Sequence, residues 1–201
     1  MKTTMKRHIT ALLCAALVMT GLEAGTAYAA GKKTPLKVGY RGTTISLIKD
    51  LGTSTGRDDT PKLSSIKKKW GNPKKGTSEG MTTYTWKKGK TSIEITDFDA
   101  GKDGVGSITI DIRDKNGSLC GVKVGMKRDA AVKKLQKQFG KKVVLVVKEG
   151  QQIDMKDDGS YIATGKETGE GETIYVYAGP YMPVSIELEN GKVTALSFWR
   201  S

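Results

Sequence analysis

The sequence predicts an α+β protein made of two tandem modules, each with one or two short helices packed on an antiparallel β-meander. The first observation is an apolar helical stripe that ends at a glycine and occurs twice with the same spacing, in residues 63–71 and 132–140. The second is that short strand patterns, separated by turn residues, follow each helix. Module 1 is placed at residues 36–120 and module 2 at residues 121–201, after a polar leader at residues 30–35.

The first 29 residues have the pattern of a secretory signal peptide. Basic residues precede the apolar stretch 9–22, and Ala27-Tyr28-Ala29 places small residues at both positions that determine cleavage. The apolar stretch is too short to span a bilayer comfortably. We therefore predict cleavage after Ala29, a secreted or envelope-associated protein, and no transmembrane segment after cleavage.

Residues 30–201 are strongly basic and contain no histidine. They carry 31 basic and 20 acidic residues, which gives a net charge of +11. They contain no histidine because the one histidine of the sequence, His8, lies in the predicted signal peptide. The lack of histidine excludes Ser-His-Asp and Cys-His catalysis and every zinc site that needs imidazole. The length suffices for one compact domain or two small ones.

Only one of the two cysteines follows the predicted cleavage site. Cys14 lies inside the apolar stretch and follows Leu13, where a lipoprotein signal needs a small residue, so we do not expect lipidation. Cys120 is then the single cysteine of the exported chain, and no intrachain disulfide can form. We expect a buried, inert thiol, with a disulfide between two chains as the alternative.

Module 1 begins with a strand-like segment at Lys37–Gly39, and Thr43–Leu51 has a weak pattern of a short helix. The main helix starts at Thr60, a good N-cap, has Pro61 at its first position and stops at Gly71. Alternation of apolar and polar residues then predicts three strands, at residues 81–86, 91–96 and 106–112.

Module 2 opens with a helix whose apolar residues share one face and which stops at Gly140. An uninterrupted apolar run at residues 143–147 predicts a buried strand, and the polar residues 150–171 predict a long loop or a strand pair with irregular turns. Asn190-Gly191 is a strong hairpin signal. It separates the last two of three expected strands, at residues 173–177, 183–189 and 192–199.

Motif-like stretches do not meet the requirements of the sites they imitate. Gly89-Lys90-Thr91 matches the end of a phosphate-binding loop, but a strand follows instead of a helix, so we predict a hairpin turn. Asp97 and Asp99 begin like a calcium loop, but Lys102 stands at the glycine position and Ile108 where the bidentate glutamate belongs. Asp154–Gly159 in module 2 fails similarly, because Lys156 stands at a ligand position. We interpret both stretches as acidic turns, with weak extracellular calcium binding as the alternative. We predict no metal, no cofactor and no catalytic residue.

Runs of lysine recur along the chain. Solvated helix faces and turns explain most of them, yet the excess positive charge attracts polyanions. For an exported protein, such partners are anionic wall polymers or phospholipid headgroups. We do not expect nucleic-acid binding, because of the predicted export and because no ordered face combines aromatic and basic residues. The runs are at residues 67–69, 74–75, 87–88, 133–134 and 141–142.

Three aromatic residues, Tyr175, Tyr177 and Trp199, are the candidate binding residues. Each alternates along its strand with apolar residues that suit a core, so alternation places all three side chains on the other face of the sheet. Exposed aromatic side chains bury a large area at a small entropic cost, which suits a binding surface. The alternative is that they form a second core between the two modules.

The segment from Val124-Gly125-Met126 through Leu135 to Phe139-Gly140, followed by strands and a closing Asn-Gly hairpin, resembles a known superfamily. It looks like the fold of the secreted β-lactamase inhibitory protein and of small outer-membrane-assembly lipoproteins, and many uncharacterised exported Gram-positive proteins look similar. The resemblance covers most of residues 36–201. The sequence departs from the pattern at Lys127, where Thr or Ser would cap the helix, and in about twenty extra residues between Gly39 and the first main helix.

This resemblance implies a non-enzymatic module that binds protein through a concave sheet face, and it transfers no inhibitor contact residue. We therefore expect a secreted, non-catalytic protein that recognises a protein at the cell surface. The alternative is a cationic protein that binds the cell wall or another anionic polymer. An enzyme with a Ser–Lys or paired-carboxylate site is a third class, and no spacing in the sequence supports it.

Overall fold

The computed structural model describes residues 37–46, 63–97, 107–157, 160–177 and 183–200. Antiparallel strands predominate in these residues and two α-helices accompany them, which confirms the α+β class. The predicted signal peptide, the leader and the helix start at Thr60 lie outside the described residues.

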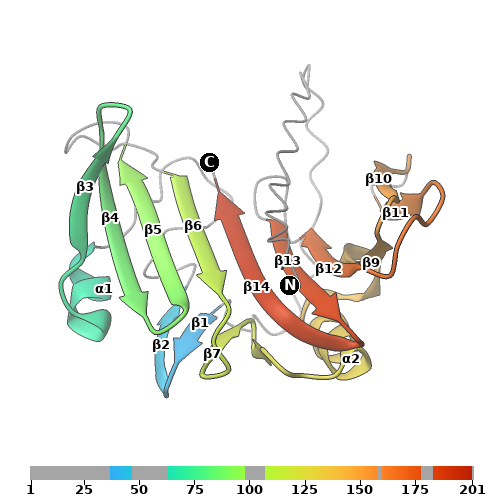
Figure 1. The fold of residues 1–201 in the computed structure, drawn as a ribbon, viewed down its shortest axis with the longest axis horizontal. Coiled ribbons are helices and arrows are strands. Elements are labelled where there is room, and N and C mark those ends of the chain that lie inside the picture. The colour runs from blue at the N-terminus through green and yellow to red at the C-terminus, as the bar shows by residue number, and fades with distance from the viewer. Residues whose placement is uncertain (1–36, 47–62, 98–106, 158–159, 178–182, 201) are drawn as a thin grey trace, which may run out of the picture. The chain divides into compact units, whose positions relative to one another are not determined.

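An eight-stranded antiparallel sheet dominates the described part of the chain (Figure 1). Its strand order is β3-β4-β5-β6-β14-β13-β12-β9, so the N-terminal and C-terminal halves contribute four strands each to one sheet. The halves meet where β6 pairs with β14, and Ile110 is there the partner of Phe198. The strands are β3 (Lys74–Ser78), β4 (Met81–Lys88), β5 (Thr91–Asp97), β6 (Ser107–Ile112), β9 (Val144–Lys148), β12 (Glu172–Tyr177), β13 (Pro183–Glu189) and β14 (Lys192–Arg200).

Every strand predicted in the two modules after their main helices is present, with ends shifted by at most two residues. The predicted turn at Gly89-Lys90 joins β4 to β5 as a hairpin. Asn190 and Gly191, with φ of 51° and 68°, connect β13 to β14, as expected for two residues of a type I′ turn. The sequence did not predict β3, because all five of its residues are exposed and no apolar alternation marks it.

The two helices are α1 (Leu63–Trp70) and α2 (Arg128–Phe139). Both stop where predicted: Gly71 and Gly140 have φ of 83° and 92°, and each donates its backbone N–H to the carbonyl four residues earlier. Lys127 precedes α2 and makes no capping hydrogen bond with its side chain. Neither of these described helices is long and apolar enough to cross a membrane.

A small sheet of order β2-β1-β7-β8 lies beside the helices. The predicted helix at Thr43–Leu51 is wrong for its first four residues, which form β2 and pair with β1; the rest lies outside the described residues. Arg41 and Gly42 both have positive φ and close the hairpin, and the β-branched residues after them favour a strand. The strands are β1 (Lys37–Tyr40), β2 (Thr43–Ser46), β7 (Gly117–Leu119) and β8 (Val122–Lys123).

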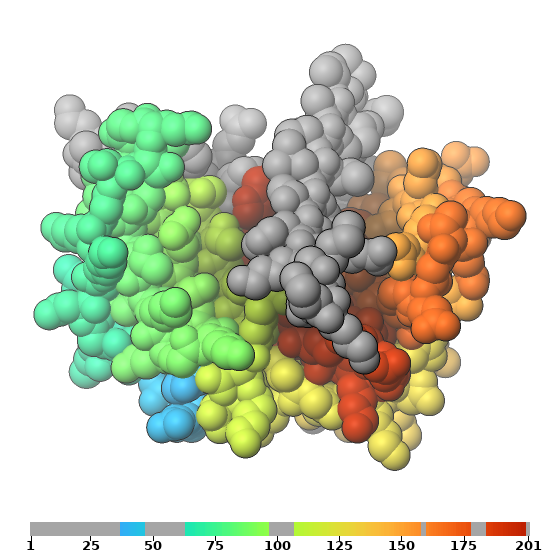
Figure 2. Space-filling view, in the orientation of Figure 1, coloured from blue at the N-terminus to red at the C-terminus, as the bar shows by residue number. Residues whose placement is uncertain are grey.

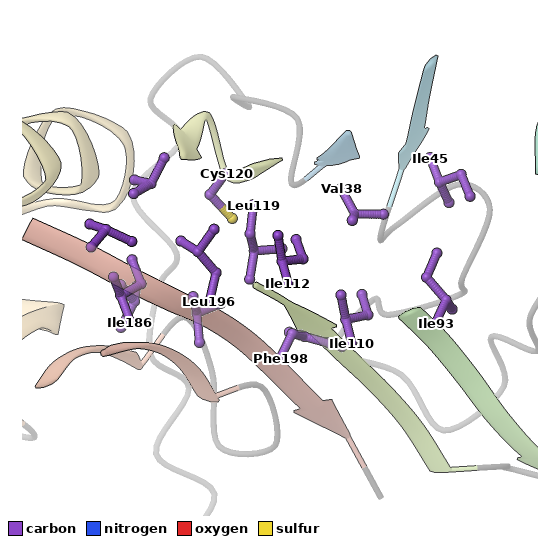
Figure 3. Packing of buried hydrophobic residues seen from close by; sticks show 14 of the residues in the cluster. Val38, Ile45, Ile93, Ile110, Ile112, Leu119, Cys120, Ile186, Leu196 and Phe198 are labelled. Carbon is purple, nitrogen blue, oxygen red and sulfur yellow. The ribbon is translucent and has the colours of Figure 1, made fainter. Parts of the chain in front are cut away.

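The main core lies on one face of the large sheet, here named the first face. Side chains of both helices and of the small sheet belong to one core cluster with those of β5, β6, β13 and β14. Figure 3 shows Val38, Ile45 and Leu119 of the small sheet on the side of the large sheet that carries this core. Trp86 of β4 adds a polar link, because its Nε1 donates a hydrogen bond to the Gly71 carbonyl at 2.8 Å. The core includes Ile66, Leu135, Val38, Ile45, Leu119, Ile93, Ile110, Ile186, Leu196 and Phe198.

The polar stretch 150–171, for which the sequence left a loop or a strand pair open, contains a strand pair. Strand β10 (Gln152–Met155) pairs with β11 (Tyr161–Thr164), and β11 lies against β9 at the end of the large sheet. The hairpin is the orange segment at the right-hand side of Figure 1.

Candidate functional site

The sheet face that turns away from both helices is here named the second face. Tyr175 and Tyr177 on β12 and Trp199 on β14 lie on it, because their neighbours along the strands are buried on the first face. Those neighbours are Ile174, Val176 and Phe198. The structure therefore places all three predicted site residues on one face, although it does not bring all three into contact.

Tyr161, Tyr175 and Tyr177 form a stack, here named the tyrosine cluster. The ring centroids of Tyr161 and Tyr177 are 4.1 Å apart with an interplanar angle of 18°, and those of Tyr175 and Tyr177 are 6.3 Å apart. None of the three belongs to the main core. All three come from residues 161–177, so the ring contacts of the cluster lie within the C-terminal half of the chain.

Burial raises the pKa of two hydroxyl groups of the cluster, those of Tyr175 and Tyr177. It raises the pKa of Tyr177 to about 12, and the neighbouring phenols Tyr175 and Tyr161 act in the same direction. Burial also raises the pKa of Tyr175, and the negative charge of Glu187 adds to this increase. At neutral pH Tyr175 and Tyr177 therefore present uncharged aromatic rings that carry hydroxyl groups.

Exposed apolar side chains extend the cluster in both directions. Met155, whose side chain is 59% exposed, is the strand partner of Tyr161 and so lies on the same side of the hairpin. In the other direction Tyr177 pairs with Pro183, and the register of β13 with β14 puts Trp199 in the same row. Two strand spacings separate Tyr177 from Trp199, about 10 Å.

We name Met155, Tyr161, Tyr177 and Trp199 the apolar row. Met155 and Trp199, which is 50% exposed, are the large hydrophobic residues with the greatest exposure in the described part of the chain, and both belong to this row. Exposed apolar groups that gather in this way mark interaction sites more often than single ones do. In Figure 2 the hairpin that carries Met155 and Tyr161 forms the orange right-hand margin of the molecule.

The remainder of the second face near β14 is polar. Arg113, just after β6, makes ion pairs with Glu187 at 3.3 Å and with Asp111 at 3.4 Å. The side chain of Ala195, the strand partner of Glu187, is buried although it does not belong to the main core. The hydroxyl oxygens of Ser185 and Ser197 lie 2.5 Å apart and share a hydrogen bond.

Sequence reasoning missed Tyr161 and Met155, which complete the row. Both lie in the polar stretch whose structure the sequence left open. A signal was present: Asp157-Asp158-Gly159 is a turn sequence, and short segments containing apolar residues flank it at 153–155 and 161–163. Nothing in the sequence indicated that this hairpin folds against β12, since that depends on contacts distant along the chain.

The other predictions about sites concern metals and the cysteine. Among the residues that the structure describes, no three His, Cys, Asp or Glu side chains form a group that could hold a metal ion. Cys120 is buried, as predicted, with 2% of its surface exposed. Burial raises the pKa of its thiol to about 12.

Comparisons with protein-family models, with curated proteins and with solved structures gave no match.

Proposed function

We propose that this protein is a secreted, non-catalytic binding protein that recognises another protein at the cell surface through the second face. The apolar row carries the proposal, because it gathers Met155, Trp199 and two tyrosines on one exposed strip. Aromatic residues and methionine are enriched in protein interfaces and supply much of their binding energy. The signal-like residues 1–29 and the absence of histidine from residues 30–201 support export and a non-catalytic role.

The dimensions of the second face suit a protein partner. Eight strands at a spacing of about 4.8 Å are about 34 Å wide, and six residues of a strand are about 20 Å long. The resulting area, about 700 Å², approaches the roughly 800 Å² that each partner contributes to a standard protein interface. A small molecule would cover only a fraction of it.

The proposal includes a tandem origin for the two halves. The chain passes through α1 and then β3, β4, β5 and β6, from one sheet edge to the centre. It then passes through α2, β9, β12, β13 and β14, from the other edge to the centre. Ile66 and Leu135, which occupy corresponding positions in the two helical stripes, are both fully buried. This arrangement supports modules at 36–120 and 121–201 that share one sheet, and it agrees with the superfamily resemblance.

The experiment is a comparative capture of partners from envelope extracts of the source organism. The bait proteins are the wild type, a variant with Tyr177→Ala and Trp199→Ala, and a variant with Met155→Ala. A protein that the wild type captures is then purified and its affinity for all baits is measured by calorimetry. We expect the double substitution to weaken binding at least about a hundredfold, since two hot-spot residues are removed.

Two matched controls separate loss of binding from loss of folding. Gln152→Ala changes an exposed residue of the same strand as Met155, with its side chain on the other side of the hairpin. Lys133→Ala with Lys137→Ala changes exposed residues of α2, on the first-face side. Both controls should bind like the wild type. Equal affinity of the double variant and the wild type would refute the proposed face.

A second candidate function is attachment to an anionic envelope polymer. The observation in its favour is that every lysine of the five runs is exposed, so the positive charge is available at the surface. Purified cell walls would sediment the protein at low ionic strength and release it as salt screens the attraction. Retention on the cell walls that does not change between low and high salt would exclude this function. The variant with Tyr177→Ala and Trp199→Ala should be retained like the wild type, because it keeps every lysine.

A further inference from the structure

A cavity of about 250 Å³ lies among three elements that are distant in sequence. The β1–β2 hairpin contributes Tyr40, Arg41 and Thr43, the last turn of α1 contributes Lys69 and Trp70, and the end of β4 contributes Lys88. All these elements except β4 pack on the first face, so the cavity is separate from the apolar row.

The cavity is electropositive. Three of its six lining residues are cationic, and no carboxylate is among them. Arg41 is held near the ring of Tyr40, with its guanidinium carbon 5.7 Å from the ring centroid. The hydroxyl group of Tyr40 donates to Asp114, at 3.5 Å, and Asp114 is not among the lining residues.

Trp70 is the one buried residue of the lining. Its side chain is 4% exposed, and its Nε1 has no hydrogen-bond acceptor among the described residues. Leaving a buried N–H unsatisfied is costly, and Trp86, the other buried tryptophan, avoids this cost by donating to the Gly71 carbonyl. The Trp70 Nε1 is shielded from solvent, so Trp70 contributes its apolar ring to the lining.

We infer that this cavity binds a phosphate group, free or as an ester of a small polyol. A guanidinium group binds phosphate oxygens in pairs, an ammonium group adds a compact positive charge, and the Thr43 hydroxyl group is a neutral donor. A water molecule in the liquid occupies about 30 Å³, so the cavity has room for phosphate and a small substituent. The faces of Tyr40 and Trp70, whose rings meet edge to face at 6.4 Å, would contact that substituent.

This site depends neither on the second face nor on the general attraction of polyanions, because it requires particular lining residues. The chain offers a matched control in β4. Lys87 and Lys88 are adjacent and both exposed, but strand alternation points them to opposite faces, and only Lys88 lines the cavity. Lys87→Gln and Lys88→Gln therefore lower the net charge by the same amount, but only Lys88→Gln removes a positive charge from the lining of the cavity.

The test is calorimetric titration of the purified protein with inorganic phosphate, glycerol 3-phosphate and glycerol, at constant ionic strength. We expect one saturable site for the phosphate probes and none for glycerol. Arg41→Gln and Lys88→Gln should each weaken binding about tenfold or more, as removal of a charge-assisted hydrogen bond does, while Lys87→Gln should change it less than twofold. Unchanged melting temperatures would show that the variants are folded.

Several results would overturn the inference. They are the absence of saturable binding of either phosphate probe, equal binding of glycerol and glycerol 3-phosphate, or an equal loss in Lys87→Gln and Lys88→Gln. The two phosphate probes also separate the sources: tighter binding of glycerol 3-phosphate assigns the site to a phosphate ester, and equal binding assigns it to free phosphate.

Discussion

Tyr161 and Tyr177 stack with their ring centroids 4.1 Å apart, and this contact joins the β10–β11 hairpin to the eight-stranded sheet. A two-stranded hairpin is marginally stable by itself in water, so its position depends on such contacts. The stack therefore fixes where Met155 lies relative to Trp199, at the two ends of the apolar row.

Tyr161→Ala should loosen the hairpin and leave the main core intact. Loss of the ring removes an aromatic pair worth about 0.5–1.5 kcal/mol beyond its buried area, while the core on the first face keeps all its contacts. Hydrogen exchange should become faster in residues 152–155 and 161–164 and stay unchanged in β6 and β14. Tyr161→Phe retains the ring and should exchange like the wild type; faster exchange throughout the sheet in Tyr161→Ala would contradict this prediction.

Stability should fall between pH 10 and pH 12, and Tyr177 should account for part of the loss. The pKa of Tyr177 is raised from 10.0 to about 12, so the unfolded chain loses this proton at lower pH than the folded protein does. The stabilising contribution is thus complete below pH 10 and disappears as pH rises through 12. Urea denaturation of the wild type and Tyr177→Phe at pH 9 and pH 11 measures it. The decrease should be smaller in Tyr177→Phe, and equal decreases would refute the prediction.

The two halves of the chain should unfold in one transition. Ile110 and Phe198 are strand partners where β6 meets β14, and both are buried in the one core cluster. Leu135→Ala in the C-terminal half should cost about 2–5 kcal/mol and lower a single urea midpoint. Ile66→Ala in the N-terminal half should lower the same midpoint. Fluorescence and far-UV circular dichroism should report coincident curves, and two separate transitions would show that the halves fold independently.

The ion pair between Arg113 and Glu187 should contribute little to stability. Both side chains are 53% exposed, so water and salt screen the attraction across the 3.3 Å contact. A double-mutant cycle with Arg113→Ala and Glu187→Ala should give a coupling free energy of about 0.2–1 kcal/mol that shrinks in high salt. A coupling above about 2 kcal/mol would mean that the pair is far better shielded than its exposure indicates.

The thiol of Cys120 should be inert in the folded protein. Burial raises its pKa to about 12, so the reactive thiolate is scarce and the sulfur is inaccessible. A Cys14→Ser variant, which leaves one thiol, should not react with Ellman's reagent in buffer and should react fully in urea. Prompt reaction in buffer, or a disulfide-linked dimer under oxidising conditions, would contradict this prediction.

The strongly patterned elements could be predicted from the sequence. Ile108, Ile110 and Ile112 alternate with polar residues and are fully buried in β6, and Gly140 marks the end of α2 through its positive φ. These signals are local: they depend on alternation, helical spacing or the conformational freedom of glycine.

The elements that sequence reasoning missed depend on distant partners. Residues 74–78 form β3 because β4 offers them a free edge, and Thr43–Ser46 form β2 because β1 pairs with them. For the candidate site, alternation identified the face that carries Tyr175, Tyr177 and Trp199. The sequence could not show that Tyr161 reaches Tyr177 or that Arg41, Trp70 and Lys88 surround one cavity, because no local pattern encodes such contacts.

Strand β3 has one consequence for how this protein behaves at high concentration. As an edge of the large sheet, it presents backbone groups to which a strand of another molecule can add. Lys74 and Lys75 are exposed along this edge, so a second copy approaching edge to edge would bring like charges together. These lysines therefore disfavour the pairing of this edge with the same edge of another molecule. Replacing both lysines with threonine would remove this repulsion, and the exposed edge could then pair with a strand of another molecule and promote aggregation.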